Sequence, residues 1–197
     1  MKKILYFPAV LFFLAACVPE AVEKADGSTT LAAKWSSLNI PHATIVYYDI
    51  AGSTAEELRS QMDSFGPVGY DGYQGDATTL WSIRWNWPGF GKGVCDLQQA
   101  VVSYTIDVVL PRWQPPDGVK PALLDQWDAY ISALVNHEKG HVDYVVDQIP
   151  RIVAAIQHAT CRTADAAADG ILQDIREHDV QYDAETDHGK SQGAQFP

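Results

Sequence analysis

The spacing of apolar residues in the first half of the chain is typical of β-strands. A β-branched and aromatic run from Ala43 to Ile50 predicts a first strand. In the next clear run, apolar residues alternate with largely polar ones and so share one strand face: Trp81, Ile83, Trp85 and Trp87. A second alternating run, from Val102 to Leu110, is expected to pair with it and to end at Pro111. We expect the strand tryptophans to be core residues.

Elsewhere the period of the apolar residues is helical. A capping box that begins at Ser53-Thr54 predicts a helix that ends at Gly66-Pro67. From Pro121, apolar residues recur every three or four positions as far as Val145, which predicts a long helix. We expect Pro150 to kink or break it, with residues 152–159 continuing it. A last helix is predicted over residues 164–182. This order, β-rich first and helical afterwards, is that of an α+β fold.

The first residues have the pattern of a targeting segment. A basic start is followed by the apolar run Ile4–Leu14, which is as long as a signal-peptide core and too short to span a bilayer. The run ends in Leu-Ala-Ala-Cys17, which resembles the lipobox of bacterial lipoproteins and implies acylation of Cys17. We therefore expect a signal peptide at 1–16, a lipidated tether at 17–38, a domain at 39–190 and a flexible tail at 191–197. The alternative is an ordinary signal peptide followed by a chance cysteine.

The other cysteines and the charge fit an exported protein. With Cys17 lipidated, Cys95 and Cys161 remain as an even pair, and we expect them to form a disulfide. Val18 after the lipidated cysteine favours the outer membrane, with the domain facing the periplasm. The formal net charge is −11, and loss of the two signal-peptide lysines makes it −13. This acidity argues against nucleic acid as a partner.

The strongest chemical signal is the run His137-Glu138-Lys139-Gly140-His141 inside the long predicted helix. His137 and His141 are four residues apart, so their side chains lie one turn apart on the same face. Two imidazoles placed in this way can share one zinc ion. Glu138 is about 100° further around the helix, where it can take a proton from a zinc-bound water. This is the H-E-x-x-H motif of metalloproteases, so the sequence predicts a zinc site with Glu138 as the catalytic base.

A catalytic zinc needs a third protein ligand, and the candidates lie in the stretch from Tyr182 to Gly189. His188 is the first choice, because a loop just after a helix can bring an imidazole onto the facing helix. Asp183 is the second choice and Glu185 the third. Tyr182 is a candidate for stabilising the oxyanion of a tetrahedral intermediate. The alternative for this stretch is a solvated acidic helix end.

Together, the motif HEKGHVDY, the later Cys161 and the run YDAETDHG resemble the DUF922 family, described as predicted secreted zinc-dependent proteases. The resemblance extends over roughly Ile40 to Gly193 and includes the segment GVCDL. It implies an active site built on His137, Glu138 and His141, and a functional role for the downstream run. It does not select the third metal ligand.

We therefore expect an α+β, zincin-like domain in which an antiparallel or mixed sheet packs on the helix that carries the zinc motif. The expected activity is hydrolysis of a peptide bond in the cell envelope, in a protein or a peptidoglycan peptide, with Zn²⁺ as cofactor. Two alternatives stay open. The first is a non-catalytic lipoprotein that binds zinc structurally, with Asp183 and His188 both available as ligands, or that serves as an interaction module. The second is a metal-free fold in which His137 and His141 are hydrogen-bonded core groups.

Overall fold

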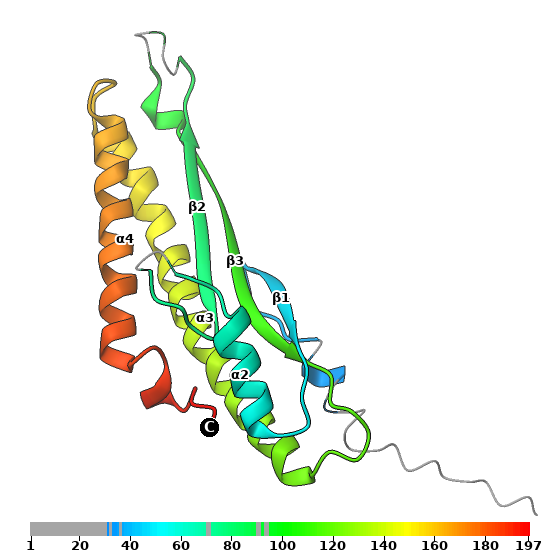
Figure 1. Ribbon diagram of the computed structural model, residues 1–197. Coiled ribbons are helices and arrows are strands. Elements are labelled where there is room, and N and C mark those ends of the chain that lie inside the picture. The colour runs from blue at the N-terminus through cyan, green and yellow to red at the C-terminus, as the bar shows by residue number, and fades with distance from the viewer. Residues whose placement is uncertain (1–30, 32, 36, 70–71, 90–91, 93–94) are drawn as a thin grey trace, which may run out of the picture.

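The structure, a computed structural model, describes residues 31, 33–35, 37–69, 72–89, 92 and 95–197. Its elements follow the expected order, which confirms the α+β class (Figure 1). In chain order they are β1 (Thr44–Ile50), α2 (Ala55–Phe65), β2 (Thr78–Asn86), η1 (Leu97–Gln99), β3 (Val101–Trp113), α3 (Pro121–His158), α4 (Ala164–Thr186) and η2 (Lys190–Gln192). The predicted signal peptide, Cys17 and most of the predicted tether lie outside the described residues.

The three strands form one mixed sheet in the order β1-β3-β2. β2 pairs antiparallel with β3, with Trp81 opposite Ile106, as the two alternating runs predict. β1 runs parallel to β3 and pairs only with its second half, residues 107–113. β2 and the first half of β3 therefore extend beyond β1 as a long two-stranded ribbon (Figure 1).

β3 does not end at Pro111, contrary to the prediction, but continues to Trp113. Its pairing with β2 stops at Val109, whereas its pairing with β1 continues to Trp113. Pro111 therefore has a neighbouring strand on one side only, which is the position at which sheets tolerate a residue without an N–H. The sequence around Pro111 does not show where a distant partner strand stops, so the local rule failed here.

α3 is a single helix of 38 residues with Pro150 inside it. Of the two effects expected of Pro150, a kink or a break, the break is wrong, although proline removes one backbone hydrogen bond and crowds the preceding turn at a cost of ~3 kcal/mol. Val145 and Ile152, on either side of Pro150, are both fully buried. Burial of each such side chain contributes roughly 1.5–3 kcal/mol, which together offsets the cost of the proline.

α3 packs against both the sheet and α4. The buried residues of α4 include Ala164, Ala168, Leu172 and Ile175. None of the helices in the described part of the chain is both long enough and apolar enough to cross a membrane.

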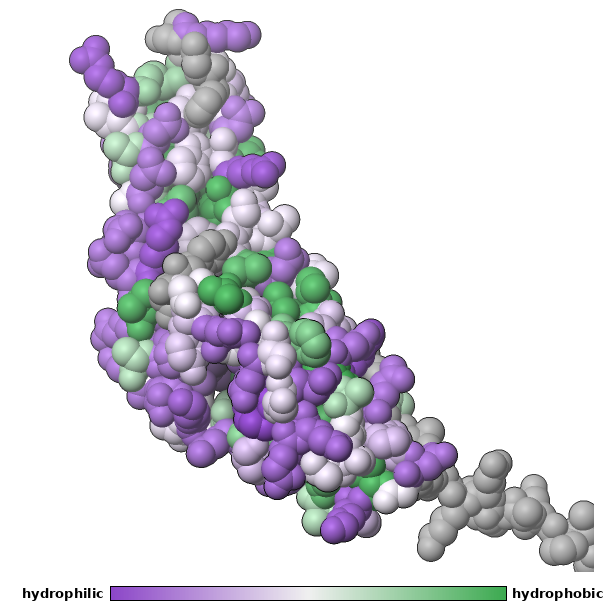
Figure 2. Space-filling view, viewed as in Figure 1, coloured by the Kyte–Doolittle hydropathy of each residue, from purple (hydrophilic) through white to green (hydrophobic). Residues whose placement is uncertain are grey.

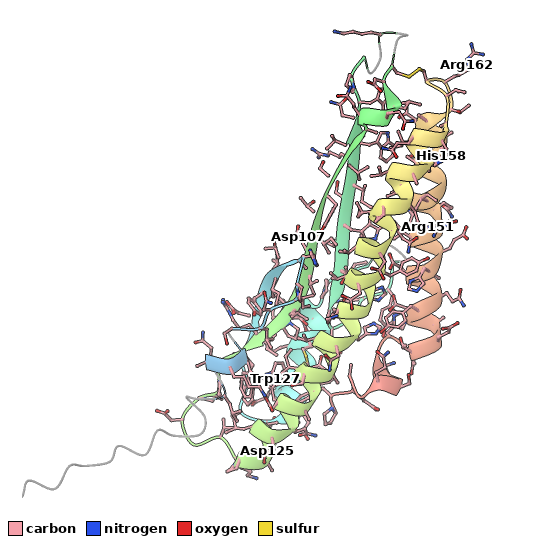
Figure 3. The ribbon with its side chains drawn as sticks, turned by 180° about the vertical axis from the view of Figure 1, so that it is seen from behind. Asp107, Asp125, Trp127, Arg151, His158 and Arg162 are labelled. Atoms are coloured by element: carbon pink, nitrogen blue, oxygen red, sulfur yellow. A yellow bond between two sulfur atoms is a disulfide. The ribbon has the colours of Figure 1, made fainter. Side chains whose placement is uncertain are left out.

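An aromatic cluster surrounds the fully buried Trp127 of α3 (Figure 3). Its ring centroid lies 5.3–6.4 Å from those of four other aromatic residues: Trp35, Trp113, Tyr130 and Phe196. The segment 191–197 is therefore not a loose tail, contrary to the prediction, because Ala194 and Phe196 are only 5% exposed. Two apolar residues in a short polar segment have no period, so the sequence could not indicate what they contact.

The predicted disulfide between Cys95 and Cys161 is confirmed. It joins the segment that follows β2 to the loop between α3 and α4, beside Arg162 (Figure 3). The far end of the β-ribbon is thereby tied to the far end of the helix pair.

Replacement of both Cys95 and Cys161 by alanine is expected to lower the free energy of unfolding by about 4 kcal/mol. The reason is that the disulfide closes a loop across 66 residues and restricts the unfolded chain. Denaturant titration of the oxidised wild type and the double variant measures the difference. A reductant should destabilise the wild type by a similar amount and leave the variant unchanged. Equal unfolding midpoints for oxidised and reduced wild type would contradict this prediction.

Candidate metal centre

Two turns of α3 bring three ionisable side chains together inside the protein. His137, Glu138 and His141 are 3%, 4% and 6% exposed. The imidazole centroids of His137 and His141 are 5.0 Å apart, and the rings are nearly perpendicular, at 86°. The two rings thus lie on successive turns, as the spacing predicts. Ionisable groups buried this deeply need hydrogen-bond partners or a metal ion.

Asp183 of α4 completes a group of three. Its Oδ1 lies 3.1 Å from His137 Nε2 and 3.0 Å from His141 Nε2. One ligand atom from each of the three residues lies within 4.8 Å of the others, and among the described residues this is the group that suits a metal ion. Asp183 is the second of the predicted candidates for the third ligand.

His188, the first predicted candidate, lies outside this group. Its Nδ1 is 3.9 Å from Asp183 Oδ2, and its ring stacks on Tyr73 with centroids 3.9 Å apart. The reason is the length of α4, which continues to Thr186, so that Asp183 is still helical and faces α3. His188 follows the helix with a φ of 50° and points to Tyr73 instead. Glu185, the third candidate, is exposed.

Each imidazole is also held at its other nitrogen by an oxygen. His141 Nδ1 lies 3.0 Å from Asp179 Oδ1, and the indole N–H of Trp81 donates to Asp179 Oδ2 at 2.9 Å. His137 Nδ1 lies 3.1 Å from Gln192 Oε1. Histidines that bind a metal usually donate their second ring N–H to such an acceptor. The surroundings of both rings therefore match those of metal ligands.

The sequence did not lead us to either of these acceptors. Asp179 had a detectable signal, because it lies four residues before Asp183 and so shares its face of α4. Gln192 had none, since it lies in the segment that the sequence suggests is loose.

These acceptors suit a metal at the opposite nitrogen of each ring. A metal ion at the Nε2 atoms would leave each imidazole with its N–H at Nδ1, where an oxygen lies in place to accept it. With the protons placed in this way, both Nε2 lone pairs face Asp183 Oδ1, which is also an acceptor. Acceptor atoms this close repel one another unless a proton or a metal ion lies between them. The centre is thus built to attract positive charge.

The pKa values reflect the same arrangement. Burial by itself would lower the pKa of His141, but hydrogen bonds to the carboxylates of Asp179 and Asp183 outweigh it and raise the pKa to about 10. Burial would raise the pKa of Asp183, yet hydrogen bonds from His137 and His141 hold it well below its usual range. In the absence of a metal, a proton on His141 supplies part of the positive charge.

Glu138 lies beside this group in a pocket of about 490 Å³. Its Oε2 accepts a hydrogen bond of 2.7 Å from the hydroxyl of Thr79 in β2. Burial raises the pKa of Glu138, although the two neighbouring histidines oppose that shift. Residues of α2, β2, α3, α4, the segment before β2 and the segment after α4 line the pocket. Figure 2 shows the molecule hollowed on this face, between α2 and α4.

Tyr182 packs against the two histidines. Its ring stacks on His137 at 5.0 Å with an interplanar angle of 13°, and its edge contact with His141 is at 4.9 Å. A Cβ at Gly140 would overlap the Tyr182 hydroxyl, so α3 passes very close to this ring. The hydroxyl accepts a hydrogen bond of 3.0 Å from Gln192, and Tyr182 is not among the described residues that line the pocket. The oxyanion role of Tyr182 stays a prediction without a supporting contact.

Comparison with known proteins supports the family resemblance. A family model described as "Bacterial protein of unknown function (DUF922)" matches residues 45–189. No curated protein and no solved structure matches the chain. The matched region contains His137, Glu138, His141 and Asp183 and ends before Gln192. It covers well over half of the chain, which therefore belongs to the DUF922 family.

Proposed function

We propose that this protein is a zinc-dependent hydrolase, and specifically a peptidase. The observation that supports the proposal is the convergence of His137 Nε2, His141 Nε2 and Asp183 Oδ1 beside the Glu138 carboxylate in a pocket. Two imidazoles and one carboxylate are a ligand set that catalytic zinc uses.

The donor atoms suit zinc in type and in spacing. Zinc binds imidazole nitrogen and carboxylate oxygen at ~2.0–2.2 Å, so neighbouring ligand atoms of a tetrahedral ion are ~3.3 Å apart. The N···O separations of 3.1 and 3.0 Å need to open only slightly. Asp179 and Gln192 leave the Nε2 lone pairs free for a metal. Three protein ligands also leave a fourth coordination position for water or substrate.

Glu138 is placed to act as a general base. A zinc ion at this centre would lower the pKa of a water molecule and polarise a substrate carbonyl. Because burial raises the pKa of Glu138, its carboxylate takes up a proton more readily than an exposed one. Thr79 holds Oε2 at 2.7 Å, which leaves Oε1 to accept a proton from water in the pocket. Glu138 then returns that proton to the leaving amine.

An extended peptide is the substrate class that suits the pocket's surroundings. In the described sheet β2 has a neighbour on one side only, so its other edge can pair with an added strand. Thr79 of β2 contacts Glu138, so a peptide along this edge would pass close to the catalytic carboxylate. We therefore propose the zincin-like arrangement that the H-E-x-x-H motif implies, acting on proteins or on peptidoglycan peptides.

A non-catalytic zinc site is the alternative, and it requires a fourth protein ligand that excludes water. His188 is the residue that the sequence offers for that closure together with Asp183. Its ring is stacked on Tyr73 and stands outside the ligand group. The pocket beside Glu138 favours a catalytic site over a closed structural one.

We also propose that the enzyme acts in the cell envelope, with a lipid at Cys17 anchoring it to the outer membrane on the periplasmic side. The Cys95–Cys161 disulfide supports an oxidising compartment. Cys17 lies outside the described residues, so the proposal of a lipid anchor rests on the lipobox-like sequence before it. The net charge of −11 opposes nucleic acid as a partner.

Asp183→Asn is expected to weaken zinc binding by more than ~100-fold. Even a residue that only hydrogen-bonds a metal ligand contributes ~10–100-fold to metal affinity, and a ligand itself should contribute more. His188→Gln is the matched control and should change the affinity little, since its ring is stacked on Tyr73. Competition with a chelator at neutral pH measures both dissociation constants. If His188→Gln weakens binding as much as Asp183→Asn, then His188 is a ligand and the proposed centre is wrong.

Glu138→Gln is expected to lower kcat by ~10²–10⁴ while leaving the zinc content unchanged, because it removes the base but not a ligand. The variant keeps an oxygen that can accept the hydrogen bond from Thr79, so the fold should be retained. Hydrolysis of labelled casein and of peptidoglycan peptides measures the loss. Glu185→Gln, an exposed change on α4, is the control. Full activity of zinc-loaded Glu138→Gln would exclude the role proposed for this carboxylate.

Zinc affinity is expected to rise with pH by up to ~tenfold per unit between about pH 6 and about pH 8. With a pKa of about 10, His141 is protonated in the metal-free protein throughout this range, and it must lose that proton to bind zinc. A higher pH therefore favours the complex. Calorimetry in buffers of different ionisation enthalpy should show about one proton released per zinc. Asp179→Asn removes a carboxylate that raises this pKa and should release fewer protons. An affinity independent of pH would contradict the argument.

A further inference from the structure

We propose that residues 187–197 form part of the metal centre, with Gln192 as a positioning residue for His137. The inference rests on the proposed function, because it concerns how His137 is presented to zinc. Gln192 lies beyond the region that the family model matches, which ends at Gly189. The case for it therefore comes from the contacts of this segment.

The side-chain amide of Gln192 contacts both His137 and the tyrosine stacked on it. Its Oε1 lies 3.1 Å from His137 Nδ1, and its Nε2 donates to the Tyr182 hydroxyl at 3.0 Å. Zinc on Nε2 would leave the ring N–H at Nδ1, so the oxygen end of the amide faces the histidine, and the Tyr182 hydroxyl, which can donate or accept, bonds the other end. Because an amide oxygen only accepts, Nδ1 keeps its proton and Nε2 presents a lone pair. Gln192 thus holds the edge of the imidazole while Tyr182 covers its face.

The backbone that leads to Gln192 also touches His137. Asp187, His188 and Gly189 have φ values of 49°, 50° and 81°, which turn the chain back from α4 towards α3. A Cβ at Gly189 would lie 2.8 Å from the Cγ of His137, so the close approach requires glycine. The segment therefore packs on the imidazole with its main chain as well as with the Gln192 amide.

Phe196 anchors the segment at a distance from the centre. Its ring lies 5.4 Å from Trp127 and 5.0 Å from Tyr130, both on α3, and it is 5% exposed. Trp127 is ten residues before His137, or about 15 Å along the helix axis. Phe196 is too far away to contact the ligand atoms. It acts by keeping Gln192 against His137.

The two ligand histidines have partners of different charge. His141 is held by the carboxylate of Asp179, whereas His137 is held by a neutral amide. Glutamate at position 192 would be a similar length and a stronger acceptor for an N–H. Gln192→Glu therefore preserves the hydrogen bond, and Gln192→Ala removes it. This pair of variants separates positioning by a hydrogen bond from simple filling of space.

The test measures the dissociation constant for Zn²⁺ alone, by chelator competition, in four forms of the full chain: wild type, Gln192→Ala, Gln192→Glu and Gln195→Ala. Gln192→Ala should weaken binding about tenfold, the lower end of the range for residues that hydrogen-bond a metal ligand, because Gln192 is exposed to solvent. Gln192→Glu should bind zinc at least as tightly as the wild type. Gln195→Ala changes an exposed glutamine of the same segment and should have no effect. The melting temperature of metal-free Gln192→Ala should match that of Gln195→Ala.

Phe196→Ala provides a second, independent measurement. If Phe196 acts through Gln192, Phe196→Ala should weaken zinc binding on its own but add little in a chain that already carries Gln192→Ala. Additive losses in this double-mutant cycle would overturn the proposed role of Phe196 as an anchor for Gln192.

The remaining outcomes are distinct from one another. Wild-type affinity in Gln192→Ala, or equal losses in Gln192→Ala and Gln192→Glu, would overturn the positioning role while leaving the zinc site intact. A wild type that binds no zinc would instead refute the proposed function, and this inference with it, before any variant is compared.

Discussion

The approach of one carboxylate oxygen to two imidazole nitrogens constrains the whole α3–α4 pair. Asp183 Oδ1 lies within 3.1 Å of both His137 Nε2 and His141 Nε2, and these groups come from two different helices. A slip of one turn between the helices would move the oxygen by ~5.4 Å and separate it from both rings. The alignment of α3 and α4 must therefore be fixed to a small fraction of a turn.

Several contacts hold α3 and α4 in this alignment. α4 packs along α3, and the Cys95–Cys161 disulfide ties the loop between the helices to the β-ribbon. Two strand tryptophans reach across to α4, where their indole N–H groups donate to Asp179 and Asp165. Trp81 thus orients the carboxylate that orients His141, so the sheet contributes to the candidate metal centre through a hydrogen bond to Asp179.

Where a property depends on local period, the sequence predicted it well. The alternation around Trp81 gave the correct strand face and partner, and the spacing of His137 and His141 gave their positions on successive turns. The even cysteine pair gave the disulfide. The predicted strand end at Pro111 and helix break at Pro150 were wrong because distant contacts outweighed the local cost of a proline. At Pro111 the deciding contact is where the neighbouring strand stops, and at Pro150 it is the burial of apolar residues on both sides.

Among the predicted candidates for a third ligand, the structure places Asp183 and not His188 beside the two histidines, for a reason of a different kind. Imidazole is the commoner zinc ligand, so chemistry alone favoured His188 over Asp183. Backbone geometry decided otherwise, because α4 continues past Asp183 and ends before His188. The centre consists of two pairs with the same i, i+4 spacing, His137 with His141 on α3 and Asp179 with Asp183 on α4. Had the two helices been taken as packed neighbours, this shared spacing would have selected Asp183 from the sequence. The position of Gln192 could not be predicted from any periodic spacing. It depends on three consecutive residues in the left-handed conformation and on where a single phenylalanine is buried.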